Sequence, residues 1–333
     1  MRRHGRISDW LLAILLLGGL ASAARAQQGM GMGNMTMPSM GAISTPSGQI
    51  FGAGKPGAEA EKPLAVLESF VSFIDPAVPR NVVGIRFDGM YGNRSPMRLE
   101  YLFAKGGLPN SVGFRLPETR VDTLDLTSFA EYSIVPWFSV FAEGSFRWIN
   151  PEINDNQSGN GDMRYGLKVC TWSSDALIAT FLVRLYQPSA RHETLGTTHW
   201  SIEPGILAAY RLNEKILIEG EFRYWAALGG SEFSGDLMRY GVGISYGQRS
   251  AGFWYMPVAE GIGWTMLNGK TMYANSATDF TVRDAAGQTI VNAYLGLRVG
   301  YGQRLELYGG YGRSFTGDIW ARDTYRLEFR FLY

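Results

Sequence analysis

The chain has 333 residues, of which 18% are charged and 13% are aromatic, and its formal net charge is +1. So balanced a charge gives no indication of a basic surface for nucleic acid or for an acidic partner, and we expect neither class of ligand. The single cysteine, Cys170, excludes an internal disulfide.

The first residues have the features of a secretory signal peptide. Three arginines within the first six residues precede an apolar run over residues 10–20, and a small-x-small triplet, Ala-Arg-Ala, occupies 24–26. The apolar run is shorter than the roughly 20 residues that a spanning helix needs. We therefore predict that residues 1–26 are removed and that the mature chain begins at Gln27.

Two segments of different character follow. Residues 27–61 are rich in Gly and Met, lack hydrophobic periodicity and cannot bury enough apolar surface to order themselves, so we predict disorder. Residues 62–80 contain apolar side chains at helical spacing after Pro63, which indicates a short amphipathic helix, with an extended lead-in as the alternative. The apolar residues are Leu64, Leu67, Phe70, Val71 and Ile74.

From about residue 82 the apolar side chains recur with a period of two. In 216–225, for example, Ile218 and Phe222 alternate with Glu219, Glu221 and Arg223. Such segments put large apolar side chains on one face and charges on the other, and they run about 10–13 residues, near the length a tilted strand needs to cross a bilayer. We predict an all-β fold for residues 81–333: a closed antiparallel up-and-down transmembrane β-barrel in the outer membrane.

The connections between these segments alternate strictly between short turns and long loops, as in bacterial outer-membrane barrels. This parity predicts about twelve strands, with ten or fourteen as alternatives, and it places 92–121 in one long loop. Residues 97–104 look strand-like: counted as a membrane strand they would give thirteen, and we interpret them instead as an extension within that loop. A further strand near 111–116 would give fourteen. The last strand alternates up to the terminal Tyr333, so the barrel assembly machinery is an expected partner, together with the lipid bilayer.

From about residue 80 onward the chain resembles the putative outer-membrane transporters labelled "MetA-pathway of phenol degradation". The likeness lies in 159–168 (GNGDMRYGLK) and in the layout of 129–148 and 200–225. The stretch 117–122 (PETRVD) is similar to that of uncharacterised planctomycete secreted barrel proteins. The resemblance implies an outer-membrane barrel and the passage of hydrophobic or aromatic compounds, and it brings no established site residues.

The charges on the inward faces are the candidate functional residues. They suit a polar, weakly selective pore; alternatively they pair across strands and fill the lumen. The candidates are Arg86, Asp88, Asp125, Glu131, Glu143, Arg147, Arg164, Lys168, Arg184, Glu203, Glu219, Glu221, Arg223, Arg239, Arg298, Arg304, Glu306, Arg326, Glu328 and Arg330.

The predicted function is therefore an outer-membrane channel or passive transporter for small solutes. The alternative is a non-conducting surface barrel whose long loops, especially 92–121 and 268–287, bind a partner or support the envelope. We predict no enzyme, cofactor or metal, because His192 and His199 show no dyad or triad spacing. The oligomeric state is left open.

Overall fold

The computed structural model describes residues 68–94, 113–316 and 321–333. The predicted signal peptide, the Gly/Met-rich lead, the first part of the 62–80 segment and the 97–104 extension lie outside these ranges. In the ranges described, no helix is long and apolar enough to cross a membrane.

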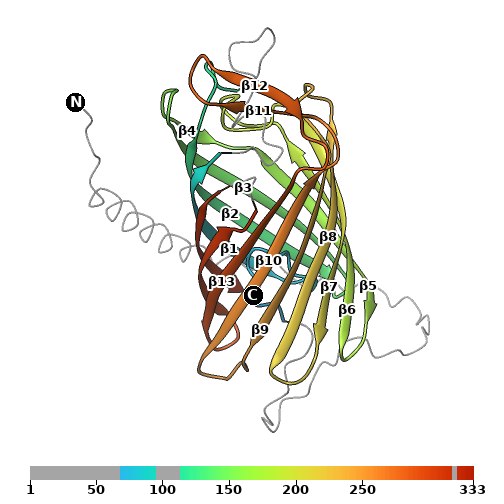
Figure 1. The fold of residues 1–333 in the computed structure, drawn as a ribbon. Coiled ribbons are helices and arrows are strands. Elements are labelled where there is room, and N and C mark those ends of the chain that lie inside the picture. Colours follow the sequence, from blue (N-terminus) through green and yellow to red (C-terminus); the bar gives the residue numbers. More distant parts are fainter. Residues whose placement is uncertain (1–67, 95–112, 317–320) are drawn as a thin grey trace, which may run out of the picture. The chain divides into compact units, whose positions relative to one another are not determined.

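Twelve long strands form the wall of a closed barrel (Figure 1). They are β1 (Val82–Asn93), β2 (Val121–Val135), β3 (Phe138–Pro151), β5 (Met163–Ser173), β6 (Leu177–Gln187), β7 (Trp200–Arg211), β8 (Ile216–Leu228), β9 (Leu237–Tyr246), β10 (Phe253–Met266), β13 (Thr289–Tyr301), β14 (Leu305–Ser314) and β15 (Asp323–Leu332). Each strand is antiparallel to the next, and β1 closes the ring by pairing with both β2 and β15. The predicted all-β, closed, twelve-strand barrel is confirmed.

Short turns and long loops alternate along the chain, as the sequence predicted. The short turns include 136–137, 174–176 and 302–304. The long loops carry the short strands β4 (Gln157–Asn160), β11 (Lys270–Ala274) and β12 (Phe280–Asp284), which gather at one end of the barrel (Figure 1). Residues 113–120 form no strand, so the fourteen-strand alternative finds no support in the part of 111–116 that is described.

One buried carboxylate organises the end of the first long loop. Glu118 is 1% exposed and accepts hydrogen bonds from the backbone N–H groups of Glu152, Ile153 and Asn154 at 3.0–3.1 Å. A carboxylate that accepts several backbone N–H groups satisfies donors that would otherwise be lost to burial. Glu118 therefore clamps the described end of this loop onto the loop between β3 and β5.

The strands turn an apolar face outward and a charged face inward. On β8, Phe222 is 51% exposed, whereas its neighbours Glu221 and Arg223 are 6% and 1% exposed. Strand β1 shows the same pattern, since its apolar residues Ile85 and Phe87 are exposed on the outer face. A closed sheet satisfies all of its backbone groups internally, and an apolar outer face is stable only against lipid. The protein is therefore an outer-membrane β-barrel.

Residues 68–81, which precede β1 and are called the plug from here on, run through the lumen without forming a helix. The possible helix over 62–80 is thus not found in its described part, and the segment has bends instead. The physical reason is that its backbone N–H and C=O groups bond to side chains of the barrel wall rather than to one another.

Candidate functional site

The apolar side chains of the plug form the core of the barrel interior. Phe70, Val71 and Ile74 are at most 1% exposed and belong to one cluster with inward side chains of the wall. Phe73 stacks on Tyr294, with ring centroids 3.8 Å apart. The helical spacing in the sequence therefore reflected packing inside a barrel, because a lumen surrounds the segment and accepts apolar side chains in several directions.

Wall carboxylates accept the backbone N–H groups of the plug. Glu219 Oε2 accepts from Phe70 and Val71 at 3.1 and 3.3 Å. Glu260 accepts from the next three residues, Ser72 to Ile74, at 2.9–3.3 Å. Both glutamates are nearly fully buried. Hydrogen bonds to ionised acceptors are stronger than those between neutral groups, so these two glutamates fix the central residues of the plug.

Wall arginines donate to the carbonyl groups of the same residues. Arg298 Nε donates to Phe70 O at 2.7 Å, and its Nη2 donates to Val71 O at 2.9 Å. Arg326 donates to Ser72 O and Arg239 to Phe73 O, each at 2.5 Å. The wall therefore supplies both acceptors and donors to a backbone that has no secondary structure of its own, which offsets the cost of burying it.

A glycine in the wall makes room for the plug between the two glutamates. Gly243 of β9 pairs in register with Glu219 of β8 on one side and with Glu260 of β10 on the other. A Cβ atom at this position would lie 2.6 Å from Val71 Cγ1. The two acids therefore flank a gap and not a cation, and the plug fills that gap.

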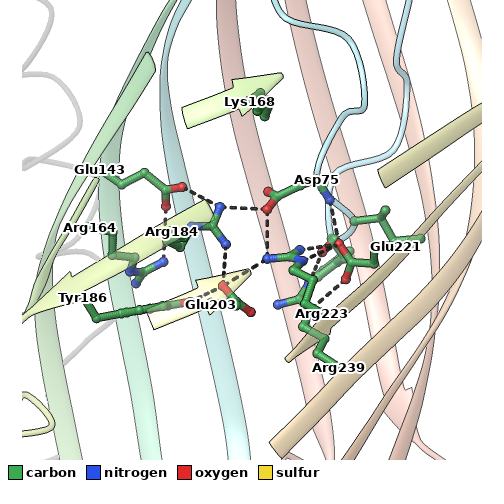
Figure 2. A network of polar contacts seen from close by, with 12 residues as sticks. Asp75, Glu143, Arg164, Lys168, Arg184, Tyr186, Glu203, Glu221, Arg223 and Arg239 are labelled. Atoms are coloured by element: carbon green, nitrogen blue, oxygen red, sulfur yellow. Dashed lines mark hydrogen bonds and ion pairs between the residues drawn. The ribbon is translucent and has the colours of Figure 1, made fainter. Parts of the chain in front are cut away.

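Asp75 is an acidic residue of the plug and lies between arginines of the wall (Figure 2). Its Oδ2 lies 2.7 Å from Arg184 Nη2 and 2.9 Å from Arg223 Nη1. Burial raises the pKa of Asp75, but the two guanidinium groups lower it by more, so its pKa is held well below the usual range. Asp75 is thus an ionised carboxylate between two arginines.

The same two arginines also bind carboxylates of the wall. Arg184 contacts Glu143 and Glu203 at 3.1 and 3.2 Å, and Arg223 contacts Glu203 at 3.4 Å and also bonds to Glu221 (Figure 2). Each charge in this network has more than one opposite partner. Such a network tolerates burial because every ion is paired and hydrogen-bonded.

The plug separates two cavities. The outer cavity has a volume of about 180 Å³, measured as space for the centres of water molecules, and reaches Met90 and Thr197 near the long loops. The inner cavity, of about 50 Å³ on the same measure, reaches Arg80 and Lys168 near the short turns. Ser72, Asp75 and Arg184 are among the residues that line both. The plug and the Asp75 network therefore stand where a path along the lumen would pass.

With one exception, the charged residues predicted to face inward are buried or partly buried inside the barrel and take part in its ion pairs or in the bonds to the plug. Arg304 is the exception, because it lies in the turn 302–304 and is exposed. The sequence pattern missed Asp75 and Glu260. Glu260 lies on a strand whose other inward side chains include Trp254, Ile262 and Trp264. The sequence pattern of this strand therefore does not predict a charged inward face.

His192 and His199 are not among the residues of this network. His192 is exposed in the loop between β6 and β7, and His199 is buried with its Nδ1 3.5 Å from Ser234 Oγ. Among the described residues, no group of three or more His, Cys, Asp or Glu side chains could hold a metal ion.

The barrel is similar to solved outer-membrane barrels. An outer membrane channel of Pseudomonas putida F1 matches with a TM-score of 0.50 at 12% identity, over 78% of this chain and 100% of that one. The KdgM porin in complex with disordered oligogalacturonate matches with a TM-score of 0.44 at 8% identity, over 76% and 99%. LpxR from Salmonella typhimurium matches with a TM-score of 0.41 at 11% identity, over 76% and 100%. At these identities the likeness concerns the fold.

No protein-family model matches the sequence, and no curated protein does. The resemblance to the "MetA-pathway of phenol degradation" transporters, and to planctomycete proteins, therefore stays a prediction.

Proposed function

We propose that the protein is an outer-membrane channel or passive transporter for small solutes, and that its own plug closes it in the state described. The observation that carries this proposal is the position of the plug between two cavities. Both cavities have charged linings, as a path for water and solutes requires. A plug that separates them makes the protein a gated passage rather than an open pore.

The way the plug is held favours a movable segment. No plug residue belongs to a strand of the wall. Its attachments are hydrogen bonds to Glu219, Glu260 and the wall arginines, ion pairs such as that of Asp75 with Arg184, and apolar packing. The plug can therefore leave while the ladder of β1–β15 stays intact, and its departure would join the two cavities.

The aromatic side chains around the outer cavity bear on the class of solute. The lining includes Tyr186 and Trp225, whose rings stack at 4.4 Å, and Trp264. Aromatic rings offer apolar contact in a lining that is otherwise charged. They support solutes with a hydrophobic or aromatic part, which is also what the family resemblance implies.

The test is single-channel conductance in a planar lipid bilayer with a plug that can be loosened and locked. Glu219→Gln together with Glu260→Gln weakens the plug. Ala77→Cys with Thr180→Cys is intended to tie it down by a disulfide where plug and wall already touch, since Thr180 Oγ1 donates to Ala77 O at 2.5 Å. Cys170→Ser removes the native thiol from this background. We expect discrete steps from the loosened protein, their loss on oxidation and their return on reduction.

A different result would support the non-conducting surface barrel. That alternative is favoured by the dense pairing of the lumen charges and by the β11–β12 hairpin in the long loop 267–288, which offers an ordered surface to a partner. Two controls show that the loosened protein is folded and its plug released: its mobility in gel electrophoresis changes on heating, and the plug amides exchange their hydrogens rapidly. If such a protein never conducts, the channel proposal is wrong.

A further inference from the structure

We propose that the outer cavity binds small organic carboxylates, and that the bound carboxylate takes the place of Asp75 between Arg184 and Arg223 and so releases the plug. This inference deepens the proposed function and rests on it. It names the class of solute and the contact through which the solute opens the passage.

Asp75 has the position of an internal ligand. A single oxygen, Oδ2, holds both arginines, at 2.7 and 2.9 Å, and the side chain is still 21% exposed. Asp75 and both arginines are among the residues that line the outer cavity. A carboxylate that enters this cavity therefore meets the two arginines from the same open side as Asp75 does, and it brings the same chemical group.

The charges of the outer cavity favour an anion. Seven arginines line it against five acidic side chains, and Glu203 and Glu221, which pair with Arg184 and Arg223, balance the other two. Withdrawal of Asp75 therefore leaves one positive charge without a counter-charge. Withdrawal of Asp75 removes one partner from each of two buried arginines, whose side chains are 7% exposed for Arg184 and 1% exposed for Arg223, and such a loss is costly. The plug can therefore leave more easily when another anion replaces Asp75.

Three of these arginines are placed to receive an incoming anion. Arg86, Arg164 and Arg239 have side chains that are 16%, 23% and 19% exposed, more than Arg184 or Arg223. Arg164 contacts Glu143 through Nη1 at 3.2 Å, and the two ion pairs of Arg86 are both long, at 3.4 Å. A guanidinium has five N–H donors, so these groups keep donors for a ligand.

The size and walls of the cavity limit the solute. A volume of about 180 Å³ for water centres accepts a compact molecule. Tyr186 and Trp225 belong to the same lining as Arg184 and Arg223, so aromatic surface is available near its apolar part. Benzoate fits this description, and benzamide is its neutral counterpart of the same shape.

The inference is tested by titrating the whole purified protein in detergent with benzoate and with benzamide, by calorimetry. We expect the protein to bind benzoate but not benzamide. Binding of benzoate should make the hydrogen exchange of the amides of residues 70–75 faster. The distinctive expectation concerns Asp75→Asn, which removes the internal competitor and should tighten benzoate binding about tenfold, the equivalent of about 1.4 kcal/mol. Arg223→Gln should abolish binding.

Asp125→Asn is the matched control. Asp125 also lines the outer cavity, but it pairs with Arg147 of the wall rather than with the plug. If Asp125→Asn tightens benzoate as much as Asp75→Asn does, the effect is one of net charge and the exchange with Asp75 is refuted. Equal binding of benzoate and benzamide would refute the carboxylate site.

The two proposals fail separately. A loosened protein that never conducts overturns the channel, whatever benzoate does. A loosened protein that conducts, combined with a wild-type protein that neither binds benzoate nor releases its plug in its presence, overturns the carboxylate site and leaves the channel standing.

Discussion

Replacing Glu260 by glutamine should detach the plug from the wall without breaking the barrel. The carboxylate is 3% exposed and accepts backbone N–H groups from Ser72, Phe73 and Ile74, as well as the hydroxyl of Tyr308 at 3.3 Å. Glutamine has nearly the same shape, but it is neutral and offers one acceptor oxygen instead of two. Its amide N–H groups would also face N–H donors of the plug.

The expected size follows from those contacts. Hydrogen bonds to charged groups contribute about 1.5–3 kcal/mol each, and neutral ones about 0.5–1.5 kcal/mol, so three weakened bonds that act together should cost about 3 kcal/mol. That free energy corresponds to about a 100-fold rise in the open population of the plug. The register of β10 with β9 and β13 involves only backbone groups, so the wall should persist.

Hydrogen exchange of the amides of residues 72–74, followed by mass spectrometry, measures this opening. We expect their protection to fall about 100-fold, while the amides of β8 and β13 keep theirs. Asp125→Asn serves as the control, because Asp125 is also buried but bonds to Arg147 rather than to the plug. Unchanged protection at 72–74 in the Glu260→Gln protein would refute the idea that side-chain carboxylates hold the plug.

Three further predictions concern the plug and one loop. Because the pKa of Asp75 is lowered below the ordinary 3.8, its ion pairs stabilise the plug above that pH and are lost as the pH falls through the lowered pKa. The plug amides should therefore lose protection in strong acid in the wild-type protein but not in the Asp75→Asn protein. Gly243→Ala should push on Val71, 2.6 Å from the new Cβ, and loosen the plug by about 1–3 kcal/mol, measured by the same exchange. Glu118→Ala should expose residues 113–120 to protease while the barrel stays folded, because five backbone amides lose their acceptor.

Each of these predictions has a result that contradicts it. If the Asp75→Asn protein still loses plug protection in strong acid, the pH dependence belongs to other groups. Gly261→Ala is the control for Gly243→Ala, because a Cβ there meets nothing within 4 Å, and equal loosening by both would exclude a steric cause. Protease resistance of 113–120 in Glu118→Ala would mean that other contacts hold this loop.

Strand number and inward charges could be predicted because both follow from local rules. A strand alternates its faces residue by residue, so Glu219, Glu221 and Arg223 had to share one face. The alternation of short and long connections, together with the placement of 97–104 in the first long loop, then led to twelve strands. Arg304 failed because its alternation with Leu305 and Glu306 continues past the end of the ladder, into the turn 302–304.

The plug could not be predicted because its contacts are neither local nor specific to residue type. Its backbone N–H groups bond to Glu219 and Glu260, more than 140 positions away, and any residue other than proline could supply those N–H groups. A signal was present in the wall, where two acids flank Gly243 with no cation between them in register. Reading it requires the register of three neighbouring strands, which hydrophobic alternation alone does not provide.

The seam between β1 and β15 has a consequence for how the molecule is assembled. The plug joins β1 at Asn81, whose carbonyl accepts from the N–H of Tyr333 at 3.3 Å, so the first and last strands meet where the plug enters the wall. The bond between Val71 and Arg330 spans 259 positions. The wall cannot enclose the plug before this seam forms, so the plug becomes surrounded only when the ring of strands is complete.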